Sequence, residues 1–107
     1  MRPEVIGYTD GVAPELDPDL LVEQAITRCA DLRDGLEDIW AELSEEEREQ
    51  VRAADRVLIR EAARLAPWWR RELAEDRVEF GFPRERWWWW IDEIADGAFP
   101  RELLPEA

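Results

Sequence analysis

The fold is decided by residues 18–43, PDLLVEQAITRCADLRDGLEDIWAEL. Apolar residues recur in this stretch in alternating steps of three and four, which is typical of a helix that packs along its whole length. Asp17 fits the N-cap position, and Pro18 fits the first helical position, where its missing N–H costs nothing. The pair Asp34–Gly35 is also typical of a turn and could divide the helix. We therefore predict one helix over 18–43 with this buried face: Val22, Ala25, Cys29, Leu32, Leu36, Ile39 and Leu43.

A second helix is predicted to follow directly, over residues 44–66. Ser44 and Glu47 form the S-x-x-E pattern of a capping box, in which each side chain satisfies a backbone N–H of the other residue. Pro67 should end or kink this helix, because proline has no N–H and its ring clashes with the preceding turn. Since no Gly or Pro separates the two helices, the connection must be tight, and we expect an antiparallel hairpin. The buried face of the second helix comprises Val51, Ala54, Leu58, Ala62 and Leu65.

The segments that flank the hairpin have weaker patterns. Residues 1–16 contain two Gly and two Pro without a helical period, so we expect an irregular segment in which Val5–Tyr8 is compatible with a short strand. After the second helix, residues 68–74 are compatible with a further helical turn or two. Residues 77–83 alternate apolar and polar at first and predict a short extended segment that could pair with Val5–Tyr8. The irregular N-terminal segment thus precedes a single helical domain over 17–107.

A run of four Trp, Trp87–Trp90, lies in a third predicted helix over 84–96. The predicted fold is therefore all-α: an antiparallel helical hairpin with this Trp-rich helix packed on it, ended by Gly97. On a helical wheel Trp89 falls on the acidic arc opposite the apolar one, and Trp88 lies at the edge. One interpretation is a Trp-rich core beneath the hairpin. The other is that Trp89, the most exposed of the four, anchors a protein partner or a second copy of the chain. The candidate partner-binding residues are Trp88, Trp89, Asp92, Glu93 and Asp96.

Five Arg residues repeat at every fourth position of the second helix. Their expected partners are acids of the first helix across the hairpin, together with acids of the second helix itself. We interpret this Arg row as a salt-bridged structural face rather than as a binding patch for nucleic acid, because the surplus of acids would neutralise it. The row is Arg48, Arg52, Arg56, Arg60 and Arg64; the expected partners are Glu23, Asp34, Glu37, Asp38 and Glu42, with Glu45, Glu49 and Glu61 nearby.

The composition favours a basic protein partner. The 107 residues include 27 acids and 14 basic residues, which gives a net charge of -13. Such a charge keeps a small protein soluble and repels phosphate backbones and anionic membranes. Every basic residue is Arg, and Lys, His and Asn are absent, which we interpret as the codon bias of a GC-rich bacterial genome. A lone Cys29 and the lack of any signal-peptide-like or membrane-spanning stretch indicate a cytoplasmic protein.

The residue inventory argues against catalysis. Without His the chain lacks the commonest general base and metal ligand, and without Lys it has no Schiff-base residue and no phosphate-binding loop of the Walker type. Ser44 is used as a helix cap, and Cys29 lies on a buried face. The acids at 45–49 are better explained as a solvated helix start than as a cation site, because carboxylates favour the positive end of a helix. We expect no enzymatic activity, no cofactor and no metal site.

Two function classes remain open at this point. The favoured one is a small acidic protein–protein interaction module that serves as an adaptor or as a small subunit of a larger assembly. The alternative is an acidic neutraliser of a basic protein, either antitoxin-like or a nucleic-acid mimic. Both predict a protein partner, and the favoured class also allows a homo-oligomer. Neither involves nucleic acid or a membrane as the ligand.

Overall fold

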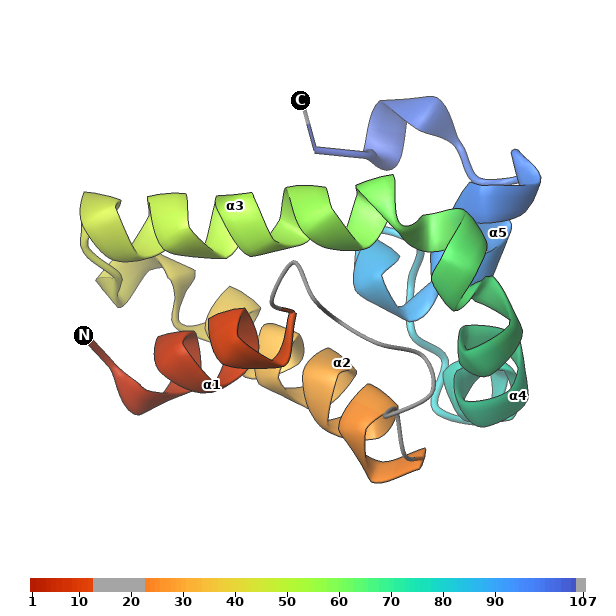
Figure 1. Ribbon diagram of the computed structural model, residues 1–107, viewed down its shortest axis with the longest axis horizontal. Helices are drawn as coiled ribbons and strands as arrows, with labels where there is room; N and C mark the ends of the chain where they lie inside the picture. The colour runs from red at the N-terminus through yellow and green to blue at the C-terminus, as the bar shows by residue number, and fades with distance from the viewer. Residues whose placement is uncertain (13–22, 106–107) are drawn as a thin grey trace.

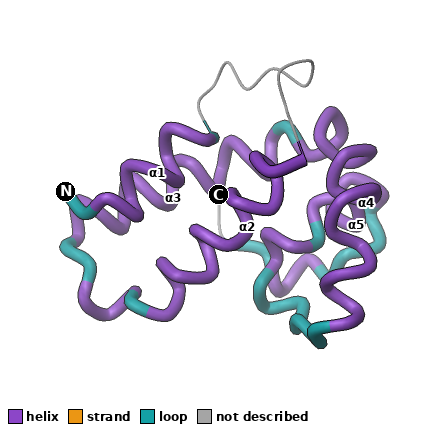
Figure 2. The backbone as a smooth tube through the Cα atoms, turned by 90° about the horizontal axis from the view of Figure 1, so that it is seen from below, coloured by secondary structure: helices purple, strands orange, loops and turns teal. Residues whose placement is uncertain are grey.

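The structure, a computed structural model, describes residues 1–12 and 23–105. These residues form five α-helices and three short 3-10 turns, without a strand, so the described part of the chain is all-α as predicted (Figures 1 and 2). Helix α3 runs along one side of the molecule, α1 and α2 lie along the other, and α4 and α5 form the end opposite the N-terminus (Figure 1). The helices are α1 (Pro3–Gly11), α2 (Glu23–Asp38), α3 (Glu45–Arg60), α4 (Ala62–Glu79) and α5 (Ile91–Asp96).

The N-terminal segment is helical, contrary to the prediction. Residues 3–11, predicted to be irregular and compatible with a strand, form helix α1, which packs against both α2 and α3. Pro3 stands at the first helical position, where its missing N–H costs nothing. Val5, Tyr8 and Val12 are spaced by three and four and are almost completely buried. Burial of this face outweighs the poor helix propensity of two Gly, so the predicted strand pairing with 77–83 is wrong.

Helix α2 is not divided at Gly35. It continues from Glu23 to Asp38 and passes into a 3-10 turn over Trp40–Glu42. Ile26 and Leu36 are fully buried, and Leu43 is buried just beyond the turn. The predicted Asp17–Pro18 start and the Val22 and Ala25 side chains lie outside the described residues.

The capping box that starts α3 is confirmed. The Glu47 backbone N–H donates to Ser44 Oγ at 3.1 Å, and the Ser44 N–H donates to Glu47 Oε1 at 3.0 Å. The direct hairpin of the two long helices is not confirmed, because α1 packs against both of them. An ion pair between Arg33 of α2 and Asp55 of α3 links the two helices at their buried faces.

Pro67 lies inside helix α4 and does not end it, contrary to the prediction. The chain bends at Glu61, and the next helix runs through Pro67 as far as Glu79, so residues 77–79 are helical rather than extended. A proline inside a helix costs about 3 kcal/mol. Leu65, Trp69 and Leu73 repeat at every fourth position and are all essentially buried. Burial of each such side chain is worth about 2–3 kcal/mol, which offsets the cost of the proline.

The third predicted helix is much shorter than expected. Only Ile91–Asp96 forms α5, ended as predicted by Gly97 at φ 76°. The Trp run does not lie in it: residues 87–89 form a 3-10 turn, and Trp90 has φ -119° and ψ 29°. A regular α-helix would direct one indole to solvent. The irregular backbone instead allows all four indoles to be buried, with exposed fractions of 2–8%.

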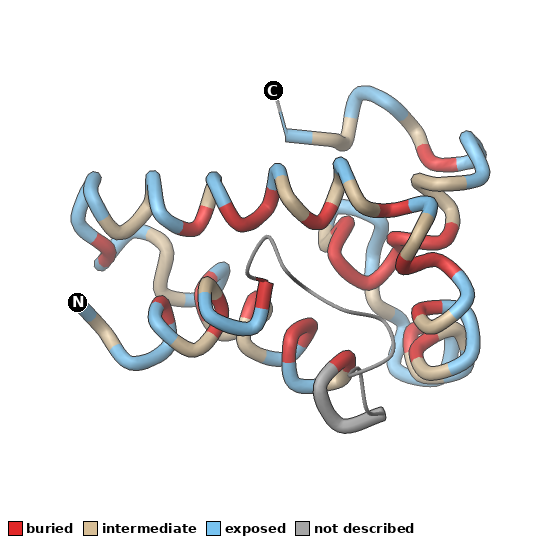
Figure 3. Tube along the Cα trace, viewed as in Figure 1, coloured by how far each residue is buried: buried red, intermediate tan, exposed pale blue. Residues whose placement is uncertain are grey.

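The buried side chains of the described residues form one hydrophobic cluster that draws on all five helices and the Trp run. Figure 3 shows the buried stretches of α3 facing α1 and α2, and further buried stretches where α4 meets α5. No helix in residues 1–12 and 23–105 has both the length and the apolar character needed to cross a bilayer.

Candidate interaction surface

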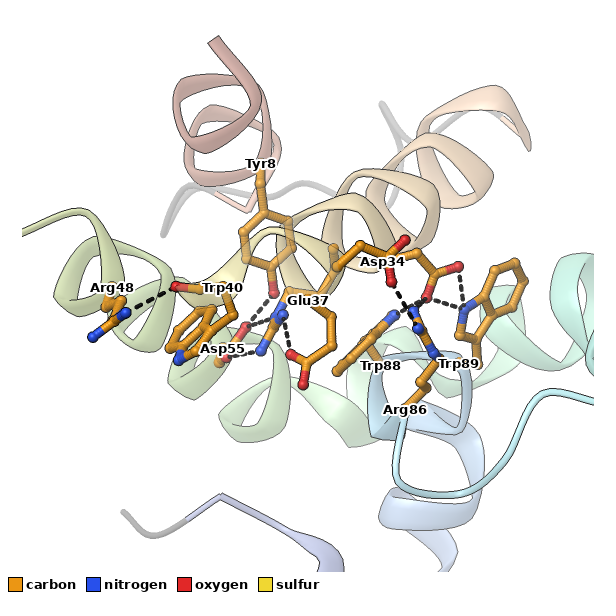
Figure 4. Close-up of polar contacts among 11 residues, drawn as sticks. Tyr8, Asp34, Glu37, Trp40, Arg48, Asp55, Arg86, Trp88 and Trp89 are labelled. Carbon is orange, nitrogen blue, oxygen red and sulfur yellow. Dashed lines mark hydrogen bonds and ion pairs between the residues drawn. The ribbon is translucent and has the colours of Figure 1, made fainter. Parts of the chain in front are cut away.

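One carboxylate, that of Asp34, binds the Trp run to helix α2. The indole Nε1 of Trp88 donates to its Oδ1 at 2.8 Å, and the indole Nε1 of Trp89 lies 3.0 Å from both carboxylate oxygens. Arg86 adds a charged hydrogen bond to Oδ1 at 2.9 Å and also pairs with Asp38 (Figure 4). Oδ1 thus accepts from all three donors and Oδ2 from Trp89, so one carboxylate gathers Arg86 and two indoles.

The prediction that Trp89 is the most exposed of the four Trp is wrong. Trp88 is 2% exposed and Trp89 is 3% exposed, whereas Trp90, at 8%, is the most exposed of the run. The Trp89 ring also stacks on Phe82, with 4.3 Å between centroids and 13° between planes. Both indoles are therefore part of the core, and neither presents the exposed anchor that the helical wheel suggested.

The three acids predicted beside Trp89 are all bound to arginines of this chain. Asp92 is buried and pairs with Arg77, whose Nη2 lies 2.9 Å from Oδ2 and whose Nη1 also donates to the carbonyl of Trp89. Burial by itself would raise the pKa of Asp92, but the hydrogen bond and charge of Arg77 outweigh it and lower the pKa. Nearer the surface, Glu93 pairs with Arg84 at 3.0 Å and Asp96 pairs with Arg70 at 2.6 Å. These contacts hold α5, and the segment that leads into it, against α4.

A second buried network joins α1, α2 and α3 (Figure 4). Asp55 accepts from Tyr8 Oη at 2.6 Å and from Arg33 Nε at 3.0 Å, and the Arg33 guanidinium lies 4.3 Å from the centroid of Trp88. Burial and the nearby Asp55 charge raise the pKa of Cys29 to about 12. The same two causes raise the pKa of Tyr8 well above 10. Tyr8 and Cys29 are therefore protonated at neutral pH, and the network links α1, α2 and α3.

The Arg row, which lies on α3 except for Arg64 at the start of α4, pairs locally rather than across to α2. Within the described residues its ion pairs are made with Glu45, Glu49 and Glu61. Arg48 also donates to the backbone carbonyls of Trp40 and Ala41 in the preceding 3-10 turn. The interpretation as a salt-bridged face therefore holds. The expected ion pairs with the first helix were wrong, because the row forms none with Asp34, Glu37, Asp38 or Glu42 among the described residues. The Glu23 side chain is outside the described residues.

The apolar side chains that remain exposed point to a different surface, at the C-terminal end of α4. Val78 is 76% exposed and Phe80 is 67% exposed, the two highest values among the large apolar residues described. Val78 lines a shallow depression of about 530 Å³ on the outer side of α4. We call this depression the α4 surface; it is lined by Ala74, Glu75, Val78 and Glu79.

The end of α4 has a glycine-dependent geometry that leaves Phe80 outside the core. Gly81 adopts φ 66°, a left-handed conformation that is cheap only for glycine. The N–H of Phe82 then donates to the carbonyl of Arg77 at 3.0 Å, and the N–H of Gly81 to that of Val78 at 3.3 Å, the two bonds of a Schellman motif. This reversal returns Phe82 to stack on Trp89 and leaves Phe80 at the tip.

Carboxylates surround this end of α4. Glu75 and Glu79 are exposed, and neither they nor Asp76 form an ion pair with a described residue. Asp31 of α2 lies close enough to Asp76 to sense its charge: partial burial, then the charges of Asp34 and Asp76, raise the pKa of Asp31. The local repulsion would be relieved by a cation.

In residues 1–12 and 23–105 no group of three or more acids and cysteines is placed to hold a metal ion. No family model, curated protein or solved structure matches this chain.

Proposed function

We propose that this chain is an acidic protein–protein interaction module, an adaptor or a small subunit of a larger assembly, and that it binds a basic protein through the α4 surface and Phe80. The observation that carries the proposal is the exposure of Val78 and Phe80 in a chain that buries its Trp run completely. A contiguous exposed apolar patch rimmed by polar groups is typical of a binding site. The proposed role involves no catalysis, cofactor or metal, and places the protein in the bacterial cytoplasm.

The charge of the surface supports a basic partner. Glu75 and Glu79 line the depression beside Val78 without an intramolecular ion pair among the described residues. Complementary charge accelerates encounter and fixes register, while an apolar contact supplies affinity. The net charge of -13 acts in the same direction over longer distances.

Capture of the native partner tests the proposal. The immobilised protein would be exposed to extract of its own cell, in parallel with Val78→Arg and Ile6→Arg. Ile6 is a 44% exposed apolar residue of α1, a helix that lies away from α4 (Figure 1), and both variants add the same charge. The proposal predicts that Val78→Arg loses a basic protein that the other two forms retain. Retention by all three would contradict it.

The alternative, an acidic neutraliser of a basic protein, is favoured by a different observation. Several exposed acids outside α4, such as Glu4, Asp10, Glu46 and Glu102, also lack an ion pair among the described residues. A neutraliser would use this diffuse charge. Its binding would fall with salt, and Val78→Arg and Ile6→Arg would weaken it equally, so these two variants separate the two functions.

A further inference from the structure

The α4 surface carries two parallel rows of side chains. Ala74 and Val78 form an apolar row, and Glu75 and Glu79 form an acidic row beside it. Within each row the residues are four apart, which corresponds to about 6 Å along a helix axis. Glu72, one turn earlier, is bound to Arg71 at 2.6 Å, so the unpaired acidic row consists of two carboxylates.

We infer that the partner presents a basic amphipathic helix to the α4 surface, with one apolar side chain in the depression beside Val78 and two cations one turn apart facing Glu75 and Glu79. This inference rests on the proposed function and adds the partner's chemistry. A helix can present cations at this spacing, since its positions i and i+4 lie on one face about 6 Å apart. Ala74 is small, which permits the close approach of a second helix axis.

Other modes of recognition fit the surface less well. Strand addition needs an exposed sheet edge, and residues 1–12 and 23–105 contain no strand. A second copy of the chain would bring a charge of -13 against an equal charge. A cationic helix avoids this repulsion and meets acids that lack a partner in the described residues.

The position of the acids on α4 supports the same partner. Glu75, Asp76 and Glu79 occupy the last two turns of the helix, near its C-terminal end at Glu79. The C-terminal end of a helix carries partial negative charge, so acids there are unfavourable and cations are favourable. Binding of a basic helix would replace repulsion among these groups with attraction.

The test uses two synthetic helical peptides of equal composition. One carries an apolar row beside two Arg that are four residues apart; in the other the same two Arg are two residues apart and fall on different faces. Titration of the full-length protein, followed by fluorescence anisotropy of the labelled peptide, should show binding of the first peptide only. Val78→Arg should abolish this binding and Ile6→Arg should leave it unchanged. Equal binding of both peptides, or no binding of either, would overturn the inference.

A matched pair of double variants tests the acidic row. Glu75→Gln with Glu79→Gln should weaken peptide binding by about tenfold, as expected for two ion pairs at the rim of an interface. Glu4→Gln with Asp10→Asn removes the same charge from α1 and should have little effect. Equal weakening would show that diffuse charge is responsible and would overturn the inference.

Failure of the inference can be separated from failure of the proposed function. If neither peptide binds but Val78→Arg still loses the native partner, the surface is correct and the helical partner is wrong. If Val78→Arg retains the native partner, the proposed function itself fails. Sedimentation of wild type and Val78→Arg tests the other possible occupant of the surface, a second copy of the chain. A dimer that Val78→Arg disrupts would contradict the inference.

Discussion

The indole N–H of Trp89 lies 3.0 Å from each carboxylate oxygen of Asp34, which ties the middle of the Trp run to helix α2. The same carboxylate binds Trp88 and Arg86. Asp34 thus organises the end of the molecule from which the α4 surface projects, because Phe82 stacks on Trp89 immediately after the Gly81 turn.

Truncation of Trp89 should destabilise the fold. Because Trp89 is 3% exposed, Trp89→Ala should lower the free energy of unfolding by about 3–5 kcal/mol, the range for large core truncations. Phe80→Ala, at an exposed position, should change it by less than about 0.5 kcal/mol. Urea denaturation measures both. A Trp89→Ala protein as stable as wild type would show that the indole is not part of the core.

Neutralising Asp34 should be costly even though the side-chain shape is kept. An Asn carbonyl has two lone pairs for the three donors that Asp34 binds, so Asp34→Asn should leave at least one of the three donors without a partner, at about 1–3 kcal/mol. Asp38→Asn is the matched control, because Asp38 is exposed and pairs only with Arg86 among the described residues. Equal, small losses of stability in the two variants would contradict the central role of Asp34.

Cys29 should be unreactive while the protein is folded. Its pKa, raised to about 12 by burial and by the charge of Asp55, leaves almost no thiolate at pH 8, and the thiolate is the reactive form. An aromatic disulfide reagent should therefore react with Cys29 only in denaturant. Stoichiometric reaction within minutes in native buffer would show that the thiol is accessible and ionised.

Stability should depend on pH through Asp31. Partial burial and the charges of Asp34 and Asp76 raise its pKa in the folded state above the 3.8 of an unperturbed Asp. The folded state then holds its proton to higher pH than the unfolded state. Any stability that Asp31 contributes is fully present below pH 3.8 and is lost as the pH rises through the raised value.

Comparison with Asp31→Asn isolates this contribution. The variant should match the wild type at low pH and become slightly more stable than it above the raised pKa of Asp31. Melting temperatures across acidic pH measure the difference. A variant that is less stable than wild type at neutral pH would indicate that Asp31 makes a favourable contact instead.

Local signals allowed the sequence to predict part of the fold. Ser44 and Glu47 predicted the start of α3, and Gly97 predicted the end of α5, because caps depend on residues close in sequence. Helix α1 was missed although Val5, Tyr8 and Val12 have helical spacing, because two Gly obscured it.

The candidate site was missed for two physical reasons. The wheel assumed 100° per residue through the Trp run, and the 3-10 turn over residues 87–89 breaks that period so that Trp89 turns inward. Pro67 was expected to end or kink the helix, yet the helix and its buried row of Leu65, Trp69 and Leu73 continue through it. Extension of that row would have placed Val78 on the outer face, where it is exposed.

The affinity of the isolated native partner for Val78→Arg, compared with Ile6→Arg, tests the central claim most directly. Both variants should keep the stability of the wild type, because both positions are exposed. A surface centred on Val78 predicts at least about a hundredfold weaker binding for Val78→Arg, from lost apolar contact and new repulsion against a basic partner, and near-wild-type binding for Ile6→Arg. Equal affinities for the two variants would contradict the claim that α4 forms the interaction surface.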